Sequence, residues 1–327
     1  MLKPYHLRYV TIPAAGLHGT ALPSLPANLI QLIKGWQKAR TLIKTFKPQK
    51  MFFTGGFLGV PVALAGLGIP SIAFVPDVEP GLALKVIIRT ASQIALATDR
   101  STKYVLASKP AVVSGYPIRD EIKKWNKLSA RKHFRLPHDE PVLLVYGGSK
   151  GSRSINSAIA SNLNTLLPEM HILHITGSTQ WEEVNKVVAL ADVSKASKYH
   201  PYPFLHEDMG AALAAADLVV CRSGASTLGE LPFFGLPALL VPYPFAWKYQ
   251  HQNAEYLAAQ NAALLLEDSA LEEKLATTIQ SLMKDDDKLS VMGRNMKKLA
   301  KPEAADVIAR MIVDLPNGRQ ATGGSKW

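Results

Sequence analysis

The chain has 327 residues, of which 47% are hydrophobic and 19% charged, and its formal net charge is +11 at pH 7. These values exclude a largely disordered chain and predict a folded protein of two domains. The longest apolar runs end before the roughly 18–20 residues that a bilayer span requires, and the N-terminus does not resemble a secretion signal. Because the single cysteine, Cys221, falls in an expected buried strand, we predict a cytoplasmic protein without transmembrane helices.

The positive charge requires an anionic partner. Nucleic acid ranks last, because the sequence has no nucleic-acid-binding motif and no basic sheet with interleaved aromatic residues. Histidine and cysteine are too scattered along the chain for a metal site, so we expect neither a metal nor another cofactor. Anionic lipid and the phosphate groups of a substrate remain as the candidate partners.

Strands and helices alternate along the first third of the chain, as in a parallel sheet with helical crossovers. The expected strands are residues 7–12, 50–54, 70–75, 93–97 and 104–106. Helices are expected at about 27–46 and 58–67, with a third after Pro80 and Gly81. The set closes with the segment 112–119.

The helix expected at 27–46 is amphipathic and basic. Its basic residues, together with those just after it, are Lys34, Lys38, Arg40, Lys44, Lys47 and Lys50. Its apolar residues are Leu29, Ile30, Ile33, Trp36, Leu42 and Ile43. Two interpretations stay open, namely a helix that packs on a core with a solvated basic face, and a helix that docks onto an anionic membrane surface.

A polar, basic segment at 120–140 connects this set to a second and more complete one. The expected strands of the second set are residues 141–146, 171–176, 199–202, 218–222, 238–242 and 262–266. The expected helices are residues 152–166, 179–191, 208–216, 225–235, 248–260, 270–284, 286–299 and 302–314. This pattern is that of one whole doubly wound domain, followed by a tail with a linker-like composition.

The most informative motif follows the strand at 218–222, where small residues lead into a helix. Backbone N–H groups of the four residues Gly224, Ala225, Ser226 and Thr227 would point at an anion at the positive end of the helix dipole. Glu230 lies about two turns into the helix and can accept hydrogen bonds from a vicinal diol such as a ribose. An ordinary strand-to-helix turn with a capping serine and a surface glutamate explains the same residues.

Three further turns follow expected strands at the edge where ligands of such sheets collect. Residues 147–153 form a second glycine-rich turn into a helix, which the alternative interpretation makes a flexible capped turn. Residues 54–59, with Gly55 and Gly56, form a similar turn in the first set and could hold an acceptor phosphate. Amides at Gln250 and Asn253 suit sugar hydroxyls, although a surface helix start explains them equally well.

Five segments in order resemble the MurG family of peptidoglycan glycosyltransferases. They are Thr54–Phe57, Gly115–Arg119, Gly147–Ser152, Cys221–Glu230 and Gln250–Ala254, and the likeness runs from about residue 8 to 312. The resemblance implies an α/β protein with the GT-B fold, in which two Rossmann-like doubly wound domains face a cleft. The implied parts are an acceptor and membrane-side domain (1–119), a UDP-sugar domain (120–300), a returning helix (301–314) and a disordered tail (315–327).

The same resemblance implies the activity and the roles of residues. Members transfer N-acetylglucosamine from UDP-N-acetylglucosamine to undecaprenyl-linked muramoyl-pentapeptide at the inner face of the plasma membrane. Donor contacts are implied for Arg119, Ser149, Gly224, Ala225, Ser226, Thr227, Glu230, Gln250, Asn253 and His206. Gly55 and Gly56 fall at the acceptor site, and Ile30, Ile33 and Trp36 fall on the membrane-facing apolar patch.

Several positions depart from the family pattern. The opening strand and the glycine-rich loop ending in histidine precede the point at which Met1 aligns, so the first domain is expected to be incomplete. Where the family has His-Glu-Gln-Asn, this chain has Phe74–Asp77, which leaves Asp77 as the candidate catalytic base or as a turn-forming aspartate. Lys150 and Tyr116 also replace the usual glutamine and asparagine.

Two other functions remain open. One is a glycosyltransferase that uses another lipid acceptor such as diacylglycerol, and the other is a truncated homologue that binds a UDP-sugar without turning it over. Both keep the donor site, which depends on one geometric expectation. The segments 147–152 and 223–230 must border the same hollow.

Overall fold

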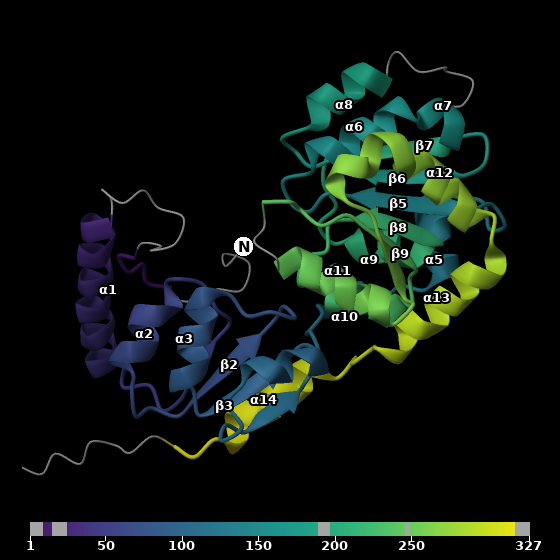
Figure 1. The fold of residues 1–327 in the computed structure, drawn as a ribbon. Coiled ribbons are helices and arrows are strands. Elements are labelled where there is room, and N and C mark those ends of the chain that lie inside the picture. The colour runs from purple at the N-terminus through teal and green to yellow at the C-terminus, as the bar shows by residue number, and fades with distance from the viewer. Residues whose placement is uncertain (1–8, 15–24, 189–196, 246–248, 318–327) are drawn as a thin grey trace, which may run out of the picture.

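The computed structural model describes residues 9–14, 25–188, 197–245 and 249–317, which build two parallel sheets covered by helices (Figure 1). We call the first sheet with its helices the first half, and the second sheet with its helices the second half. Residues 7–8, the end of the helix expected at 179–191, residue 248 and the tail from 318 lie outside the described residues.

The first half holds a sheet of four parallel strands in the order β1-β2-β3-β4. These are β1 (Met51–Phe53), β2 (Ser71–Val75), β3 (Gln93–Leu96) and β4 (Ala111–Val113). Successive residues of β2 point to opposite faces. Ala73 and Val75 pack under α2 and α3, whereas Ile72 and Phe74 face the last helix of the chain.

Three helices accompany these strands in sequence. They are α1 (Leu25–Phe46), α2 (Gly59–Ala65) and α3 (Leu82–Thr90). Figure 1 shows α1 at the outer side of the first half, where α2 lies between it and α3. None of the described helices combines the length and the hydropathy that crossing a bilayer demands.

Two strand predictions in this half are wrong. Residues 9–12 of the strand expected at 7–12 pair with no other strand, and Tyr9 and Val10 are exposed. The strand expected at 104–106 is replaced by the end of a 3-10 helix, η3 (Asp99–Tyr104), because the Val105 N–H donates to the Thr102 carbonyl rather than to a neighbouring strand. The fourth strand, β4, comes later, and its Val112 lies opposite Ala95 of β3.

The second half holds six parallel strands in the order β10-β9-β8-β5-β6-β7. The strands are β5 (Val142–Tyr146), β6 (His171–Ile175), β7 (Tyr199–Tyr202), β8 (Leu218–Cys221), β9 (Ala238–Leu240) and β10 (Ala263–Leu265), which confirms all six strands that the sequence predicts. The order is that of dinucleotide-binding Rossmann folds, and its direction reverses between β5 and β8. Both strands are fully buried, as expected for a parallel sheet covered on both faces.

Helices cover both faces of the second sheet. They are α4 (Asp120–Lys123), α5 (Lys127–His133), α6 (Arg153–Ser161), α7 (Leu163–Leu166), α8 (Trp181–Val188), α9 (Met209–Ala215), α10 (Thr227–Phe234), α11 (Tyr249–Ala259), α12 (Leu271–Met283) and α13 (Asp286–Lys298), with the 3-10 turn η5 (Asp268–Ala270) before α12. The helix expected at 152–166 is divided at Asn162, whose side-chain amide donates to the Ala158 carbonyl.

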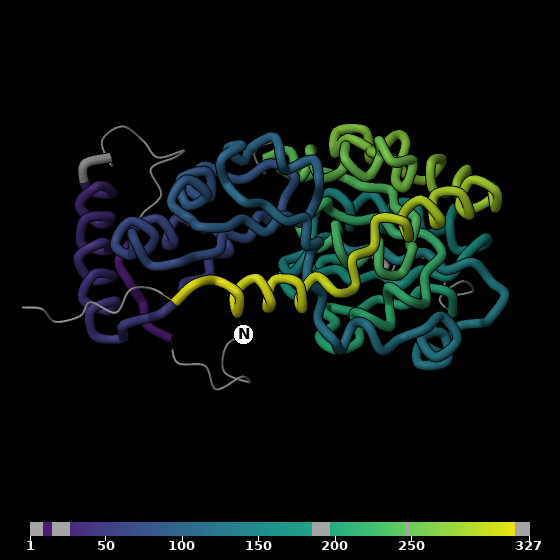
Figure 2. Tube along the Cα trace, turned by 90° about the horizontal axis from the view of Figure 1, so that it is seen from below, coloured from purple at the N-terminus to yellow at the C-terminus, as the bar shows by residue number. Residues whose placement is uncertain are grey.

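The chain returns to the first half at its end. After α13, the helix α14 (Ala304–Asp314) lies under the first sheet, where Ile308, Met311 and Leu315 pack against Ile72 and Phe74. Figure 2 shows this last segment running back along the molecule from the second half to the first. One of the two apolar layers that cover the first sheet is therefore formed by α14, at the end of the sequence.

Candidate functional site

The two glycine-rich turns of the second half leave from neighbouring strands. Tyr146 at the carboxyl end of β5 lies opposite Cys221 at the carboxyl end of β8, so both turns leave the sheet from neighbouring strand ends. This is the point where the strand order reverses, and ligands of doubly wound sheets bind at such points. The segments 147–152 and 223–230 therefore begin side by side. That they border one hollow stays a prediction.

Arg222 fastens the two turns together. Its guanidinium donates to the hydroxyls of Ser152 (2.7 Å) and Ser154 (2.8 Å), at the start of α6. It also donates to the carbonyls of Val241 and Pro242, and it forms an ion pair with Asp268 at 2.5 Å.

Sequence reasoning missed Arg222. An arginine directly after a fully buried strand indicates a buried network of polar contacts, because a charge in such a place must find partners inside the protein. The Asp268 partner lies 46 positions further along, in η5, and nothing in the spacing of the two residues announces their pairing.

The turn at 147–151 depends on glycine for both its conformation and its packing. Gly148 has φ +92° and Gly151 has φ +79°, which side chains rarely adopt. A Cβ atom on Gly151 would lie 2.0 Å from the Thr176 carbonyl oxygen, after β6. Ser149 is exposed at the tip of this turn, where its hydroxyl can reach a ligand.

The turn at 223–227 leaves backbone donors open. Thr227 and Leu228 already donate their N–H groups to the carbonyls of Gly224 and Ala225. Within the described part of the chain, the N–H groups of Gly224, Ala225 and Ser226 have no hydrogen-bond partner. A Cβ atom on Gly224 would meet no atom within 4 Å, so this side of the turn is open.

Thr227 differs from the three residues before it. Its side chain is almost fully buried, and its hydroxyl donates to the Gly224 carbonyl at 2.6 Å. In this arrangement, Thr227 stabilises the turn from inside rather than presenting its hydroxyl to a ligand.

Glu230 lies in the first turn of α10, partly buried, beside residues of the segment that joins the two halves. Burial raises the pKa of its carboxyl group, while a hydrogen bond with Ser226 and the charge of Arg119 lower it. Burial also raises the pKa of Tyr116, with further contributions from the charges of Glu230 and Asp77. The structure therefore gathers Glu230, Arg119, Tyr116 and Asp77, which come from both halves, into one electrostatic cluster.

Asp77 follows β2 at the carboxyl edge of the first sheet, and its carboxylate accepts a hydrogen bond from the Asn253 amide at 2.8 Å. Burial raises the pKa of Asp77, and this hydrogen bond lowers it. Asn253 has no exposed surface, because it also accepts from the Val78 N–H (2.9 Å) and donates to the Ser223 carbonyl (3.0 Å). These contacts within the protein occupy the amide that the sequence analysis assigns to the sugar.

The remaining expected residues lie in segments that follow strands of the two sheets. The Gln250 side-chain oxygen accepts from the Tyr243 N–H at 2.9 Å, and the Ser223 hydroxyl donates to the Gln250 carbonyl. His206 is exposed in the loop after β7, where its ring packs edge-on against Phe204. Gly55 (φ +103°) and Gly56 (φ +79°) form the turn after β1, the strand next to β2 and Asp77.

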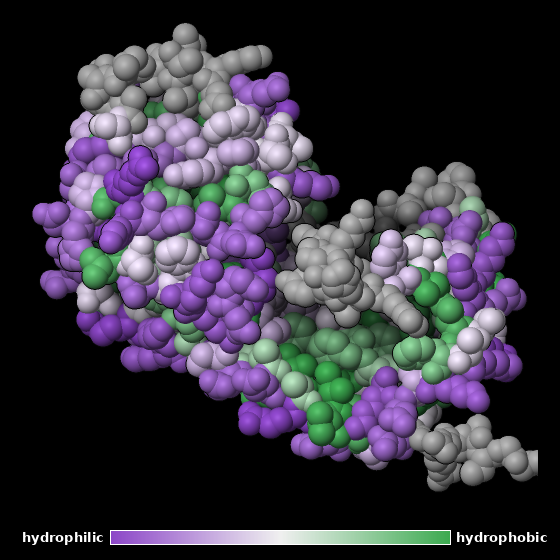
Figure 3. Space-filling model, turned by 180° about the vertical axis from the view of Figure 1, so that it is seen from behind, coloured by the Kyte–Doolittle hydropathy of each residue, from purple (hydrophilic) through white to green (hydrophobic). Residues whose placement is uncertain are grey.

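The apolar residues expected on a membrane surface lie on α1. Ile30 and Ile33 are about half exposed, at 52% and 49%, and Leu29 beside them is exposed at 53%. Trp36 is partly buried, with the Arg40 guanidinium 5.5 Å from its ring centre. In the view from behind, apolar surface gathers on the first half, whereas the second half is mostly polar (Figure 3).

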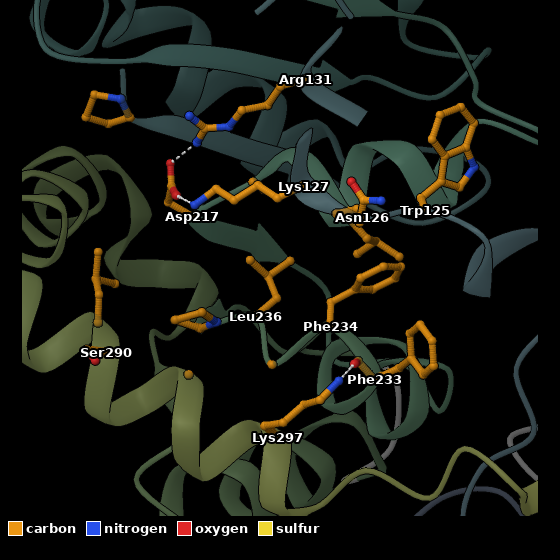
Figure 4. Close-up of a pocket in the computed structure, with 18 of the residues that line it drawn as sticks. Trp125, Asn126, Lys127, Arg131, Asp217, Phe233, Phe234, Leu236, Ser290 and Lys297 are labelled. Atoms are coloured by element: carbon orange, nitrogen blue, oxygen red, sulfur yellow. Dashed lines mark hydrogen bonds and ion pairs between the residues drawn. The ribbon is translucent and has the colours of Figure 1, made fainter. Parts of the chain in front are cut away.

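A cavity of about 750 Å³ lies at the opposite edge of the second sheet, among α5, α13 and the amino ends of β5, β8 and β9 (Figure 4). Its cations have partners inside the protein. Lys127 and Arg131 both pair with Asp217, at 2.5 and 2.7 Å, and Lys297 donates to the Phe233 carbonyl. The cavity lies at the amino ends of these strands, away from the switch point at the carboxyl ends of β5 and β8.

Comparison with known proteins places this geometry in a family. Residues 142–308, which contain both turns, match the model of the glycosyltransferase family 28 C-terminal domain. The UDP-N-acetylglucosamine--N-acetylmuramyl-(pentapeptide) pyrophosphoryl-undecaprenol N-acetylglucosamine transferase of Roseiflexus sp. is 35% identical, over 97% of this chain and 80% of the relative. The crystal structure of Acinetobacter baumannii MurG superposes with a TM-score of 0.73 at 25% identity, over 96% of this chain and 86% of that one. The chain belongs to the MurG family of glycosyltransferases.

A second transferase of the same name, from Desulforudis audaxviator, is also 35% identical, over 95% of this chain and 84% of the relative. The UDP-GlcNAc 2-epimerase of Neisseria meningitidis has a TM-score of 0.66 at only 12% identity, which shows a shared fold and nothing further. The GT-B architecture expected from the sequence is confirmed. MurG-family membership makes this chain a UDP-sugar-dependent transferase.

Proposed function

We propose that this chain transfers N-acetylglucosamine from UDP-N-acetylglucosamine to the lipid-linked muramoyl-pentapeptide, as the names of its relatives state for them. The observation that supports this most is that the two turns after β5 and β8 leave from the carboxyl ends of neighbouring strands. Glu230 follows the second of these turns. A nucleoside diphosphate requires an anion site and a nearby diol acceptor, and this region offers both.

The donor diphosphate binds at the start of α10. The open N–H groups of Gly224, Ala225 and Ser226 donate to its oxygens at the positive end of the helix dipole, and Ser149 contributes from the facing turn. Glu230 accepts hydrogen bonds from the ribose hydroxyls. The amide N–H₂ of Gln250, whose oxygen accepts from Tyr243, donates to the sugar, and the uracil lies toward the loop of His206.

Transfer then requires a base and stabilisation of the leaving group. Asp77 takes the proton of the acceptor hydroxyl, whose oxygen attacks the anomeric carbon from the side opposite the diphosphate. The bond between that carbon and the phosphate oxygen breaks, and UDP leaves with the electron pair. The N-terminus of α10 and the Arg119 guanidinium stabilise the negative charge that develops on UDP.

Burial suits Asp77 to this task. A carboxyl with an ordinary pKa is a weak base at neutral pH, and burial moves the pKa of Asp77 upward, toward the range where a general base is most effective. Gly55 and Gly56, in the turn after the strand next to β2, have no side chains and leave room for the acceptor diphosphate.

We propose that the acceptor is reached at an anionic membrane surface. The support is the row of half-exposed apolar side chains on α1, Leu29, Ile30 and Ile33, next to the exposed lysines Lys34 and Lys38. Such a helix lies in the lipid headgroup region, with its apolar side chains inserted and its lysines at the phosphates.

A transfer assay tests the proposal. Protein, UDP-N-acetylglucosamine labelled in the sugar and lipid-linked muramoyl-pentapeptide are incubated in detergent micelles, with diacylglycerol as the competing acceptor in a parallel reaction. Labelled muramoyl lipid is the expected product. Label in diacylglycerol alone would assign the other acceptor, and UDP-sugar binding without any labelled lipid would leave a binding protein without activity.

A further inference from the structure

The helix α11 bridges the two halves through one of its faces. Tyr249, Asn253 and Tyr256 are spaced four and three residues apart, so they lie in one row along the helix. An added Cβ atom on Gly81 would lie 3.3 Å from the Tyr249 hydroxyl, and the Tyr256 hydroxyl lies 3.3 Å from Asp99. All three side chains of a second-half helix therefore contact the first half.

Asn253, at the centre of the row, makes the closest connection. Its amide joins the carboxylate of Asp77 and the backbone N–H of Val78 to the Ser223 carbonyl, at 2.8, 2.9 and 3.0 Å. Both amide hydrogens and one acceptor position of the oxygen are thereby used. Asn253 and Val78 have no exposed surface, so this connection is shielded from water.

The backbone of the turn after β2, which contains Asp77 and Val78, is also held by a contact within the first half. The Ser101 hydroxyl donates to the Asp77 carbonyl at 3.2 Å, but no first-half residue among those described contacts the Asp77 carboxylate through a hydrogen bond. The titratable and charged groups around the carboxylate are Tyr116 and, beyond it, Glu230 and Arg119. The direction of the Asp77 side chain thus depends on a residue of the other half.

We propose that Asn253 is a positioning residue, which holds the Asp77 carboxylate at a fixed place relative to the turn at 223–227, where the donor diphosphate binds. Asn253 bonds at once to Ser223, the first residue of that turn, and to Asp77, so it links the proposed base to the proposed donor site directly. This inference rests on the proposed function and extends it. Proton transfer in this enzyme depends on contact between the halves as well as on the residues that touch substrate.

The variant Asn253→Ala tests the inference with four measurements. Transfer is expected to fall about 100-fold in kcat, since misplacing a reacting group by about 1 Å costs that much. UDP affinity, measured by calorimetry, is expected to stay within about threefold, because Gly224 to Ser226 and Glu230 remain. Hydrogen exchange of the Val78 amide is expected to accelerate, because it loses its buried acceptor.

The fourth measurement is the pH dependence of kcat/KM. The hydrogen bond from Asn253 lowers the pKa of Asp77, and its removal raises that pKa further. The active form is the carboxylate, so the acid limb of the profile is expected to move to higher pH. A role confined to structure would lower activity without moving this limb.

Two further variants complete the test. Tyr256→Phe removes another contact of the same helix face with the first half and keeps Asn253, so the acid limb is expected to stay where it is in the wild type. Asp77→Asn keeps a partner for the Asn253 amide, so Val78 stays protected while transfer is lost. If Asn253→Ala does not fold, Asn253→Asp retains the acceptor for Val78 and replaces the donor to Asp77 by a second carboxyl group, which is expected to raise the pKa of Asp77 by like-charge repulsion.

The results separate failure of this inference from failure of the proposed function. A wild-type protein that transfers no sugar contradicts the function, whatever the exchange of Val78. An active wild type, with Asn253→Ala and Asn253→Asp unchanged in kcat and in the acid limb, overturns the positioning role.

Discussion

At the scale of single residues, Glu230 offers the most direct test of the donor site. Because a hydrogen bond to a charged group is worth about 1.5–3 kcal/mol, Glu230→Gln is expected to weaken UDP binding about 10- to 100-fold. Titration calorimetry with UDP measures the change. Glu182, an exposed glutamate in the first turn of α8, provides the control, and Glu182→Gln is expected to bind UDP as the wild type does.

Asp77 leads to a prediction about pH. Burial raises its pKa above the usual aspartate value, so the acid limb of kcat/KM is expected to lie above the range of an exposed aspartate. Activity is lost as the pH falls through the raised pKa, because the protonated carboxyl accepts no proton. Asp77→Asn is expected to remove transfer and to leave UDP affinity unchanged. A wild-type acid limb at the ordinary aspartate pKa would contradict the assignment.

The residues of the site differ in how far the sequence predicts them. Gly224, Ala225 and Ser226 could be placed, because a strand followed by small residues and a helix fixes where the free N–H groups point. The contacts of Asn253 and Arg222 could not, because each joins residues that are far apart in the chain, with 176 positions between Asn253 and Asp77 in one case. The residue type shows that a buried amide or guanidinium needs hydrogen-bond partners. Which residues these partners are depends on how the elements pack together.

At the scale of elements, the Arg222 network is expected to contribute strongly to stability. It joins the ends of β8 and β9 to the starts of α6 and η5. Removing one partner of a buried ion pair typically costs about 3–5 kcal/mol, so Arg222→Ala is expected to lower the free energy of unfolding by that amount. Urea unfolding measures it. The substitution Arg153→Ala, at an exposed arginine of α6, is expected to have little effect.

The helix α1 gives a second prediction at this scale. Ile30→Glu with Ile33→Glu places charges on its exposed apolar face, and binding to vesicles with an anionic lipid fraction is expected to be lost. Cosedimentation measures binding, and circular dichroism checks that the helix is retained. Phe46, exposed at the far end of α1, supplies the control variant Phe46→Ala. Unchanged binding of the double variant would show that α1 packs only within the protein.

Elements were predictable where burial leaves a clear pattern. The central strands β5, β8 and β9 are continuous apolar runs, because both of their faces are covered, and all six strands of the second half were found. The run at 104–106 is also apolar, yet it forms no strand. The Val105 N–H donates to the Thr102 carbonyl at the end of a 3-10 helix, and the strand next to β3 is Ala111–Val113 instead. The order of strands, on which the site depends, is set by crossover packing and cannot be read from any one segment.

At the scale of the whole molecule, the return of α14 makes the first half dependent on the end of the chain. Ile308 and Met311 pack against Ile72 and Phe74 of β2. Truncating each of these side chains in a core typically costs about 2–5 kcal/mol, so Ile308→Ala with Met311→Ala is expected to destabilise the first half specifically. The donor turns lie on the other sheet, so UDP affinity at low temperature is expected to remain within about threefold of the wild type.

Calorimetric scans with and without UDP separate the two effects. The double variant is expected to show an early transition that UDP does not move, followed by a later one that UDP raises, because the ligand stabilises only the half that binds it. Val313→Ala, at a position of α14 that is 72% exposed, serves as the matched control and is expected to scan like the wild type. A single transition raised by UDP in the double variant would mean that the contact through α11 makes both halves unfold as one unit.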